Sequence, residues 1–126
     1  FVADFMGSPA MNLLNATAEA GALRIDGTSI TLPMPATKDG VKQGQELVVG
    51  IRPETMRLDE RGKLEAICEV AELTGPELIV TAQAGSQRLM ACLPPRTAVA
   101  AGQTLKLGFD ANALHLFDRP TGRRCE

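Results

Sequence analysis

Apolar and polar residues alternate along most of this chain with a period of two. Residues 22–25 and 29–32 follow that pattern, and Asp26-Gly27 separates the two runs. A period of two places alternate side chains on opposite faces of a strand. Because both central positions of a two-residue hairpin favour positive φ, Asp26-Gly27 predicts a tight turn between two antiparallel strands.

The strand that begins at Lys63 has the clearest two-sided pattern. Glu65 and Glu69 are expected on one face, where Ile67 and Leu73 interrupt the polar series. Those interruptions indicate either a second packing surface or scattered exposed apolar residues, which are common. The opposite face is expected to hold Leu64, Ala66, Cys68 and Val70.

Further alternating runs predict strands over residues 47–51, 78–82, 89–93 and 105–109. Asp59-Glu60-Arg61-Gly62 predicts the turn of a second hairpin-like region, and Lys38-Asp39-Gly40, Gly75-Pro76 and residues 84–86 predict other loops or turns. Pro53 and Pro94-Pro95 are expected to end strands, because proline lacks the ladder donor. Helix-friendly composition occurs only over residues 16–22 and 96–101. The predicted fold class is all-β, a small barrel or sandwich.

Residues 41–58 and 99–116 are two copies of one pattern at a constant offset of 58. Six aligned positions are identical in the two copies: Val, Gly, Gln, Leu, Gly and Leu. Upstream, Leu32-Pro33 and Leu93-Pro94 also correspond if the second loop is three residues shorter. Because a repeat governs the whole architecture, the chain is expected to contain two related β modules.

Composition excludes several classes of function. With 126 residues, 44% hydrophobic and 22% charged, the chain has the size and composition of one ordinary globular domain or of two small modules sharing a core. The net charge of −2 and aromatic content of 3% argue against a nucleic-acid surface, which needs a basic patch or stacking rings. No apolar run approaches the roughly 20 residues that span a bilayer. The apolar opening over residues 1–6 suggests a fragment that continues something upstream.

Candidate chemistry is sparse. Cys68, Cys92 and Cys125 form no C-x-x-C pair, so a buried small hydrophobe is favoured over a metal ligand at Cys68, and no metal site is expected. His115 is the sole histidine, and a packed or hydrogen-bonded role at a strand edge is favoured over catalysis. There is no P-loop and no G-x-G-x-x-G motif.

Each of two groups of charged residues could be either solvated surface or a functional site. Glu65, Glu69, Glu72 and Glu77 favour a solvated strand face over acid–base work, which needs geometry and shifted pKa values. Arg119, Arg123 and Arg124 favour a solvated tail over an anion site.

Four stretches, in this order, resemble one protein family. Residues 1–12 are similar to the segment that follows the nucleotide-binding domain in sugar-importer ATPases. Gly50-Ile51-Arg52-Pro53-Glu54 looks like the G-[IV]-R-P-E motif of those proteins, and residues 72–77 fit their E-x-x-G-x-E segment. Residues 107–122 resemble the closing L-G-F-D…L-H-L-F-D…T-G signature. Asp4 stands where glycine is usual in the family, and the tail Arg123-Arg124-Cys125-Glu126 is a second departure; both weaken residue-level transfer.

The resemblance implies the C-terminal regulatory, transport-associated domain of the ATPase subunit of an ABC importer for sugars or glycerol 3-phosphate. It implies an OB-like or MOP-like β-barrel over residues 1–126 that helps two subunits associate and receives inhibitory signals in some members. The implied partners are a second full-length subunit, transmembrane permease subunits reached through the ATPase domain, and a regulatory protein, but no nucleic acid. The implied place is the cytoplasmic face of the inner membrane.

No catalytic, cofactor-binding or metal-binding residue is expected in the fragment. ATP and Mg²⁺ are implied only for an N-terminal domain, since the Walker and L-S-G-G-Q motifs are absent here. The motif positions are expected to have structural or interface roles, and they are Gly50, Arg52, Pro53, Glu54, Glu72, Gly75, Glu77, Phe109, Asp110, His115 and Phe117.

Three further expectations concern two glycines, a local ion pair and an alternative function. Gly50 and Gly108 are expected either at a close backbone approach or bulge, or simply at a strand end. Arg52 and Glu54 are expected to form a local ion pair around Pro53. The alternative function is a small-ligand sensor, such as an oxyanion-binding barrel, while an independent enzyme has only His115 and scattered carboxylates in its favour.

Overall fold

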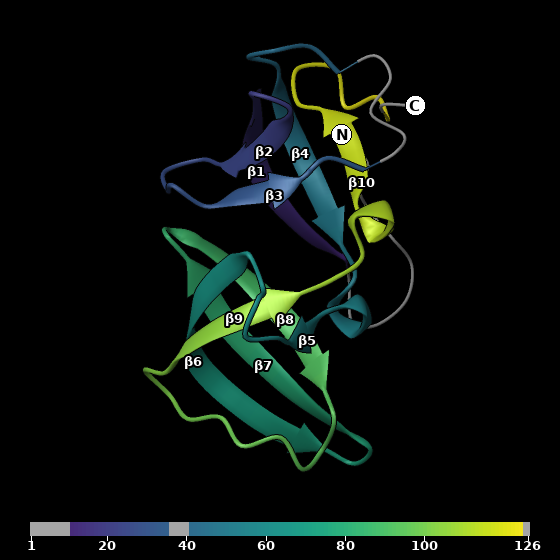
Figure 1. The fold of residues 1–126 in the computed structure, drawn as a ribbon. Coiled ribbons are helices and arrows are strands. Elements are labelled where there is room, and N and C mark those ends of the chain that lie inside the picture. Colours follow the sequence, from purple (N-terminus) through teal and green to yellow (C-terminus); the bar gives the residue numbers. More distant parts are fainter. Residues whose placement is uncertain (1–10, 36–40, 125–126) are drawn as a thin grey trace.

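The computed structural model describes residues 11–35 and 41–124, which form two five-stranded antiparallel sheets (Figure 1). Sheet A has the order β10 (His115–Asp118), β4 (Glu46–Ile51), β1 (Asn12–Glu19), β2 (Ala22–Ile25) and β3 (Thr31–Pro33). Sheet B has the order β5 (Arg57–Leu58), β9 (Thr104–Gly108), β6 (Leu64–Thr74), β7 (Glu77–Ala84) and β8 (Gln87–Leu93). The all-β prediction is confirmed.

The two copies of the repeat exchange their second strands. The first copy forms β4 in sheet A, the 3-10 turn η1 (Pro53–Thr55) and then β5 in sheet B. The second forms β9 in sheet B, the 3-10 turn η2 (Ala111–Ala113) and then β10 in sheet A. Figure 1 shows yellow β10 beside blue β4, although they are far apart in sequence. Each sheet therefore needs strands from both copies.

The strand registers obey the same offset as the sequence. Gly50 pairs with His115 across β4 and β10, and Gly108 pairs with Arg57 across β9 and β5. Adding 58 to Gly50 gives Gly108, and adding 58 to Arg57 gives His115. The duplication seen in the sequence is therefore an approximate twofold relation between the sheets.

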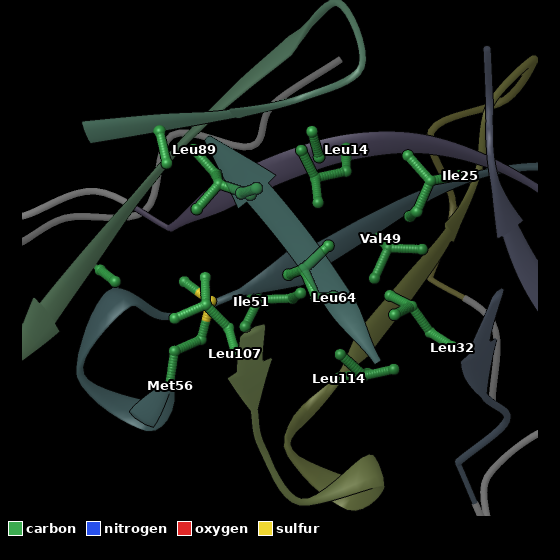
Figure 2. Close-up of a cluster of buried hydrophobic side chains, with 14 of the residues drawn as sticks. Leu14, Ile25, Leu32, Val49, Ile51, Met56, Leu64, Leu89, Leu107 and Leu114 are labelled. Atoms are coloured by element: carbon green, nitrogen blue, oxygen red, sulfur yellow. The ribbon is translucent and has the colours of Figure 1, made fainter. Parts of the chain in front are cut away.

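One hydrophobic core lies between the sheets (Figure 2). Leu14, Ile25 and Val49 enter it from sheet A, and Leu64 and Leu107 enter it from sheet B, all fully buried. Burying such a side chain stabilises the fold by roughly 1.5–3 kcal/mol relative to leaving it exposed. The core therefore joins the two sheets into one folding unit.

Several strand boundaries and turns follow the sequence pattern. β4 ends before Pro53 and β8 ends before Pro94, as expected from the missing proline donor. Gly75 and Gly85 both adopt positive φ, of 65° and 64°, in the turns after β6 and β7. The predicted loop at Lys38-Asp39-Gly40, the resembling residues 1–10 and Cys125 lie outside the described residues.

The tight two-residue turn at Asp26-Gly27 was a wrong prediction. Leu23 pairs with Leu32, and the amide of Ile25 donates to the carbonyl of Ile30, so the loop spans residues 26–29. The hydroxyl of Thr28 donates to the Ile25 carbonyl and accepts from the Ile30 amide. Those two bonds stabilise the longer loop.

The second hairpin was also wrong in its pairing. The turn at residues 59–62 exists, but β5 and β6 do not pair, because β9 lies between them. A β-carbon at Gly62 would lie 2.5 Å from the carbonyl oxygen of Leu107, so this close turn requires glycine.

Val70 does not lie on the buried face, as the simple alternation predicted. The register of β6 against β7 shifts between Cys68 and Val70, which is the signature of a β-bulge. Beyond the bulge Val70 is 47% exposed, while Leu64, Ala66 and Cys68 are buried as expected.

Candidate functional site

Four of the motif positions, Gly50, Arg52, His115 and Phe117, lie around the pairing of β4 with β10. His115 pairs with Gly50, and Nη2 of Arg124 donates to Nδ1 of His115 over 2.6 Å. The Arg124 guanidinium also lies 6.0 Å from the centre of the Phe117 ring. Burial, followed by the charges of Arg124 and Arg52, lowers the pKa of His115. This histidine is thus held neutral and hydrogen-bonded on an edge strand.

Gly50 and Gly108 both lie at close approaches. A β-carbon at Gly50 would lie 2.6 Å from Sδ of Met11, and one at Gly108 would lie 2.9 Å from Cβ of Asp59. Real β-carbons essentially never come this near another atom. The approaching atoms belong to the side chains of Met11 and Asp59, so neither glycine is at the close backbone approach raised by the sequence, and Gly108 is the last residue of β9.

The predicted ion pair between Arg52 and Glu54 is wrong. Among the described residues no salt bridge joins them. Pro53 is buried at the start of η1. Its neighbours Arg52 and Glu54 affect the pKa of two different groups. Arg52 lowers the pKa of His115, whereas Glu54 helps to raise that of Cys92. The 3-10 turn therefore separates the two side chains instead of pairing them.

The 3-10 turn η2 takes the place in the second copy that η1 takes in the first, and η2 has a polar N-cap. The carboxylate of Asp110 accepts from the amide of Asn112 over 2.9 Å and so caps η2. Phe109, partly buried beside it, packs against the core. Asp110 aligns with Arg52, which has no side-chain cap on η1. These positions shape the crossover between sheets.

The remaining motif positions lie along the β6–β7 hairpin. Glu72 is exposed on β6, Gly75 forms the turn, and Glu77 begins β7. Burial raises the pKa of the Cys92 thiol, and the carboxylate of Glu77 raises it further. The structure therefore brings Glu77 to Cys92 but leaves Glu72 and Gly75 away from the His115 group.

Neither described cysteine has the environment of a reactive thiol. Cys68 and Cys92 are free and buried. Burial is the main cause that raises the pKa of Cys68, and the Glu69 carboxylate adds to it. Reactive thiols need a lowered pKa and access to solvent, so these two are packing residues.

Across residues 11–35 and 41–124, no three His, Cys, Asp or Glu side chains gather as a metal site. In the same residues no helix is long and apolar enough to cross a membrane.

Asn12 links the two sheets, a role that the sequence did not reveal beyond its place in the resembling opening. Its amide donates to the carbonyls of Ile51, over 3.1 Å, and Met90, over 2.7 Å, and accepts from the Met90 amide over 2.8 Å. Asn12 is the buried polar residue of the described chain. It ties sheet A to β8 through a fully bonded side chain.

Gln87 forms a second polar link between the sheets. Its side chain accepts from the amide of Asn15 over 2.7 Å and donates to the carbonyl of the same residue over 3.0 Å. An amide side chain thus pairs with backbone as a neighbouring strand would. An isolated glutamine beside a turn offers no sequence signal for such a contact.

The solvated-tail prediction is corrected for Arg119, whereas Arg123 and Arg124 are exposed as expected. Arg119 donates to the carbonyls of Ala16 and Leu47 and forms an ion pair of 2.9 Å with Asp26. Arg124 contacts His115, as described above. Chain reversal at Thr121 and Gly122, whose amides both donate to Asp118, brings this segment back onto sheet A.

A small basic hollow of about 90 Å³ lies beside β5 and the end of β9. Arg57, Arg61 and Lys63 line it together with Asp59, whose carboxylate is 3.8 Å from Arg57. Three cations against one carboxylate make it the described hollow best suited to a small anion.

Two family descriptions match consecutive parts of the chain. The MalK OB fold domain matches residues 7–56, and the TOBE domain matches residues 49–117. The second match covers more than half of the chain. Both matches include Gly50 and Pro53, at the end of β4 and the start of η1.

Curated relatives match nearly the whole chain. The sn-glycerol-3-phosphate import ATP-binding protein UgpC of Escherichia coli O6:H1 is 38% identical over 130 residues, covering 98% of this chain and 35% of that protein. The oligosaccharides import ATP-binding protein MsmX of Bacillus subtilis is 31% identical over 131 residues, covering 96% of this chain and 36% of that protein. The chain therefore spans about a third of the length of these relatives.

The fold is also similar to that of a solved structure, the cytoplasmic molybdate-binding protein ModG with molybdate bound. The TM-score is 0.68 with 14% identity, covering 88% of this chain and 98% of that one. At that identity the likeness concerns the fold alone.

Proposed function

The chain belongs to the family of MalK-type OB-fold and TOBE domains, and we propose that it is the C-terminal regulatory and dimerisation domain of the ATP-binding subunit of an ABC importer. The observation that carries the proposal is the OB-to-TOBE order across residues 7–117, shared with glycerol-3-phosphate and oligosaccharide import proteins. The transported substrate class is then a sugar or glycerol 3-phosphate.

In this proposal the domain acts by contact. ATP and Mg²⁺ are bound by a separate nucleotide-binding domain, which also meets the permease subunits at the cytoplasmic face of the membrane. The motif positions described above shape turns and strand ends, which suits a scaffold. A second subunit and a regulatory protein are the proposed partners.

Exposed apolar side chains on the outer face of β6 support the dimerisation part. Ile67 and Val70 are 52% and 47% exposed. They pair with Gln83 and Thr81 on the same outer face, and the β-bulge brings Val70 there. Exposed apolar clusters on a protein surface commonly mark protein contacts.

Sedimentation velocity tests dimerisation on the longer gene product, with and without residues 1–126. Removal of the domain is expected to weaken ATP-dependent association, and Ile67→Asn with Val70→Asn is expected to do so in part. Glu72→Gln, exposed on the same outer face of β6, is the matched control. Unchanged association after removal of the whole domain would eliminate the dimerisation role.

Two simpler observations test the rest. The gene's reading frame is expected to encode an ATPase domain immediately before Phe1, and its absence would remove the main support for the proposal. Phosphate release from Mg-ATP by this chain alone is expected to equal the buffer rate. Turnover above that rate would contradict the lack of ATPase activity.

A small-anion sensor is the second candidate, favoured by the basic hollow at Arg57, Arg61 and Lys63. Calorimetry with molybdate, sulfate and glycerol 3-phosphate distinguishes it, with Arg61→Gln as the variant and Arg96→Gln as the exposed control. Heat that disappears in Arg61→Gln alone would support the sensor. Absence of heat for every anion would leave the contact role.

A further inference from the structure

Arg61 and Arg119 align in the repeat but lie in different places. In the first copy's sheet the ladder continues past β10, because the amide of Arg119 donates to the carbonyl of Glu46 over 3.0 Å. In the other sheet the last such bond joins the amide of Asp59 to the carbonyl of Lys106. The chain then turns, and the amide of Arg61 donates to the carboxylate of Asp59 instead.

Arg119 fills a defined position on the outer face of sheet A. Its guanidinium donates to the carbonyls of Ala16, over 2.9 Å, and Leu47, over 3.1 Å. It also pairs with the carboxylate of Asp26 at 2.9 Å and lies 3.7 Å from that of Glu46. Backbone and side chain together close this end of the sheet.

The corresponding end of sheet B is open. Ala66 pairs with Leu105 as Ala16 pairs with Leu47, and Thr104 aligns with Glu46. Two hollows meet at Thr104. One, of about 600 Å³, runs along the edge of β9 past Asp59 and Glu60. The other, of about 540 Å³, lies between the loop at residues 27–30 and the outer face of β6 at Glu65 and Ile67.

The edge of β9 at Thr104 has no backbone partner among the described residues, because pairing with β5 stops at Lys106. Such an edge accepts an added strand through its amide and carbonyl groups. At the equivalent position in sheet A, the carbonyl of Glu46 accepts from the amide of Arg119. The open edge is therefore where an extended segment would continue the ladder.

The charges of the two hollows favour a cation. They hold four carboxylates, of Asp59, Glu60, Glu65 and Glu69. Asp59 is 3.8 Å from Arg57, and Glu69 is 3.0 Å from Arg88, while Lys106 lies across the strands from Glu65. No ion pair in the described residues engages Glu60 or Glu65. These carboxylates stand around Thr104 of sheet B, which aligns with Glu46 of sheet A, where Asp26 and Glu46 bind Arg119.

We propose that this open end binds an extended, arginine-bearing segment of a partner protein. The segment's backbone pairs with Thr104, and its guanidinium lies over the carbonyls of Ala66 and Leu105, beside Glu65. Ile67 covers the aliphatic part of the arginine. The inference deepens the proposed regulatory function and rests on it for the existence of a partner.

The test is a titration of the 15N-labelled 126-residue chain with acetyl-Gly-Arg-Pro-Thr-amide, which copies residues 119–121. Amide shifts are expected at Thr104, Glu65, Gly85 and Thr28. The matched control replaces arginine by citrulline, which is isosteric and neutral. Because charge-assisted hydrogen bonds are the strong ones, it is expected to bind about tenfold more weakly.

Variants separate the two parts of the site. Thr104→Pro removes the edge amide without touching the β6 ladder and is expected to abolish binding. Glu65→Gln is expected to weaken binding about tenfold, because it removes one charge-assisted hydrogen bond. Glu72→Gln, exposed on the same strand and outside both hollows, is expected to bind as the parent does. Retained dispersion of the amide spectrum shows that each variant is folded.

Three results would each overturn the inference: amide shifts confined to other surfaces, equal binding of the citrulline peptide, or no shift at all. The last applies up to about 10 mM peptide, which is near the weak limit of such contacts. The titration contains no nucleotide and no second subunit. A negative result here with normal subunit association removes the peptide site alone. Binding here with association unchanged by deletion removes the dimerisation role alone.

Discussion

In the first copy of the repeat, the sheet edge at β4 is covered as far as Glu46, whereas in the second copy the edge at β9 is covered only as far as Lys106. The strands before this point pair in equivalent registers. The difference begins at Asp59-Glu60-Arg61-Gly62, which aligns with Phe117-Asp118-Arg119-Pro120. The few residues that follow β5 and β10 thus decide whether the end of the sheet is closed, as in sheet A, or open, as in sheet B.

Gly62 is the physical cause of the divergence. Its amide donates to the carbonyl of Asp59 over 2.7 Å, and its α-carbon lies so near Leu107 that a side chain would not fit. Pro120, aligned with it, cannot donate an amide bond. Duplication preserved the core of the module while its ends took different contacts.

The largest expected effect tests the equality of the two copies in the core. Leu47 and Leu105 align, and both are fully or almost fully buried. Leu47→Ala and Leu105→Ala should each lower the free energy of unfolding by about 3 kcal/mol, through lost burial and the cavity left behind. Urea unfolding followed by circular dichroism measures both. A cost below about 1 kcal/mol at either position would mean that the copies do not share one core.

The next effect concerns the turn itself. Gly62→Ala should destabilise the protein by about 2 kcal/mol, because the new methyl group meets a backbone carbonyl that cannot move freely. Pro120→Ala, at the aligned exposed position, should change stability by less than about 0.5 kcal/mol. Thermal unfolding of the pair checks this. Equal effects would show that the turn is not constrained by Leu107.

A smaller effect separates the aligned arginines. Arg119→Ala should cost about 1–2 kcal/mol, since it removes charge-assisted bonds to two carbonyls and Asp26. Arg61→Ala, exposed in its turn, should cost less than about 0.5 kcal/mol. The measurement is again the free energy of unfolding in urea. A costly Arg61→Ala would place a buried contact where the structure shows an exposed turn.

The smallest effect is a pH dependence confined to one copy. The pKa of His115 is lowered in the fold, so the unfolded chain binds the proton more readily. The stability from neutral His115 is therefore present above the unfolded pKa and is lost as pH falls through the folded one. Stability should fall on acidification below neutral pH, and His115→Gln should flatten that slope.

His115 is the sole histidine, which makes the measurement specific. Asp118, whose pKa is lowered by bonds from Gln45 and Thr121, loses its contribution only at lower pH. The aligned residue in the first copy is Arg57, so this histidine has no counterpart there. An unaltered slope in His115→Gln would remove the assigned environment of His115.

Strand alternation and the repeat were enough to predict the fold class and two related modules. They did not predict β1, because Asn15, Ala16, Thr17 and Ala18 carry weak strand signals although they lie in a central strand. The exchange of β5 and β10 was equally hidden, since local alternation does not name a strand's partner. Burial and long-range pairing decide both.

The site was less predictable than the fold. The motif positions marked real turns and close approaches, but the contacts of Asn12, Gln87 and Arg119 join residues 72 to 103 positions apart. Such bonds depend on the finished arrangement of the sheets. The bulge that exposes Val70 also has no glycine or proline to announce it.

Amide hydrogen exchange of Arg119 and Arg61 tests the contrast between closed and open ends most directly. The amide of Arg119 donates to Glu46 within the ladder, whereas that of Arg61 donates to a carboxylate in an exposed turn. Arg119 is expected to exchange at least about tenfold more slowly than Arg61, relative to their unfolded rates. Equal protection at the two aligned positions would contradict this expectation.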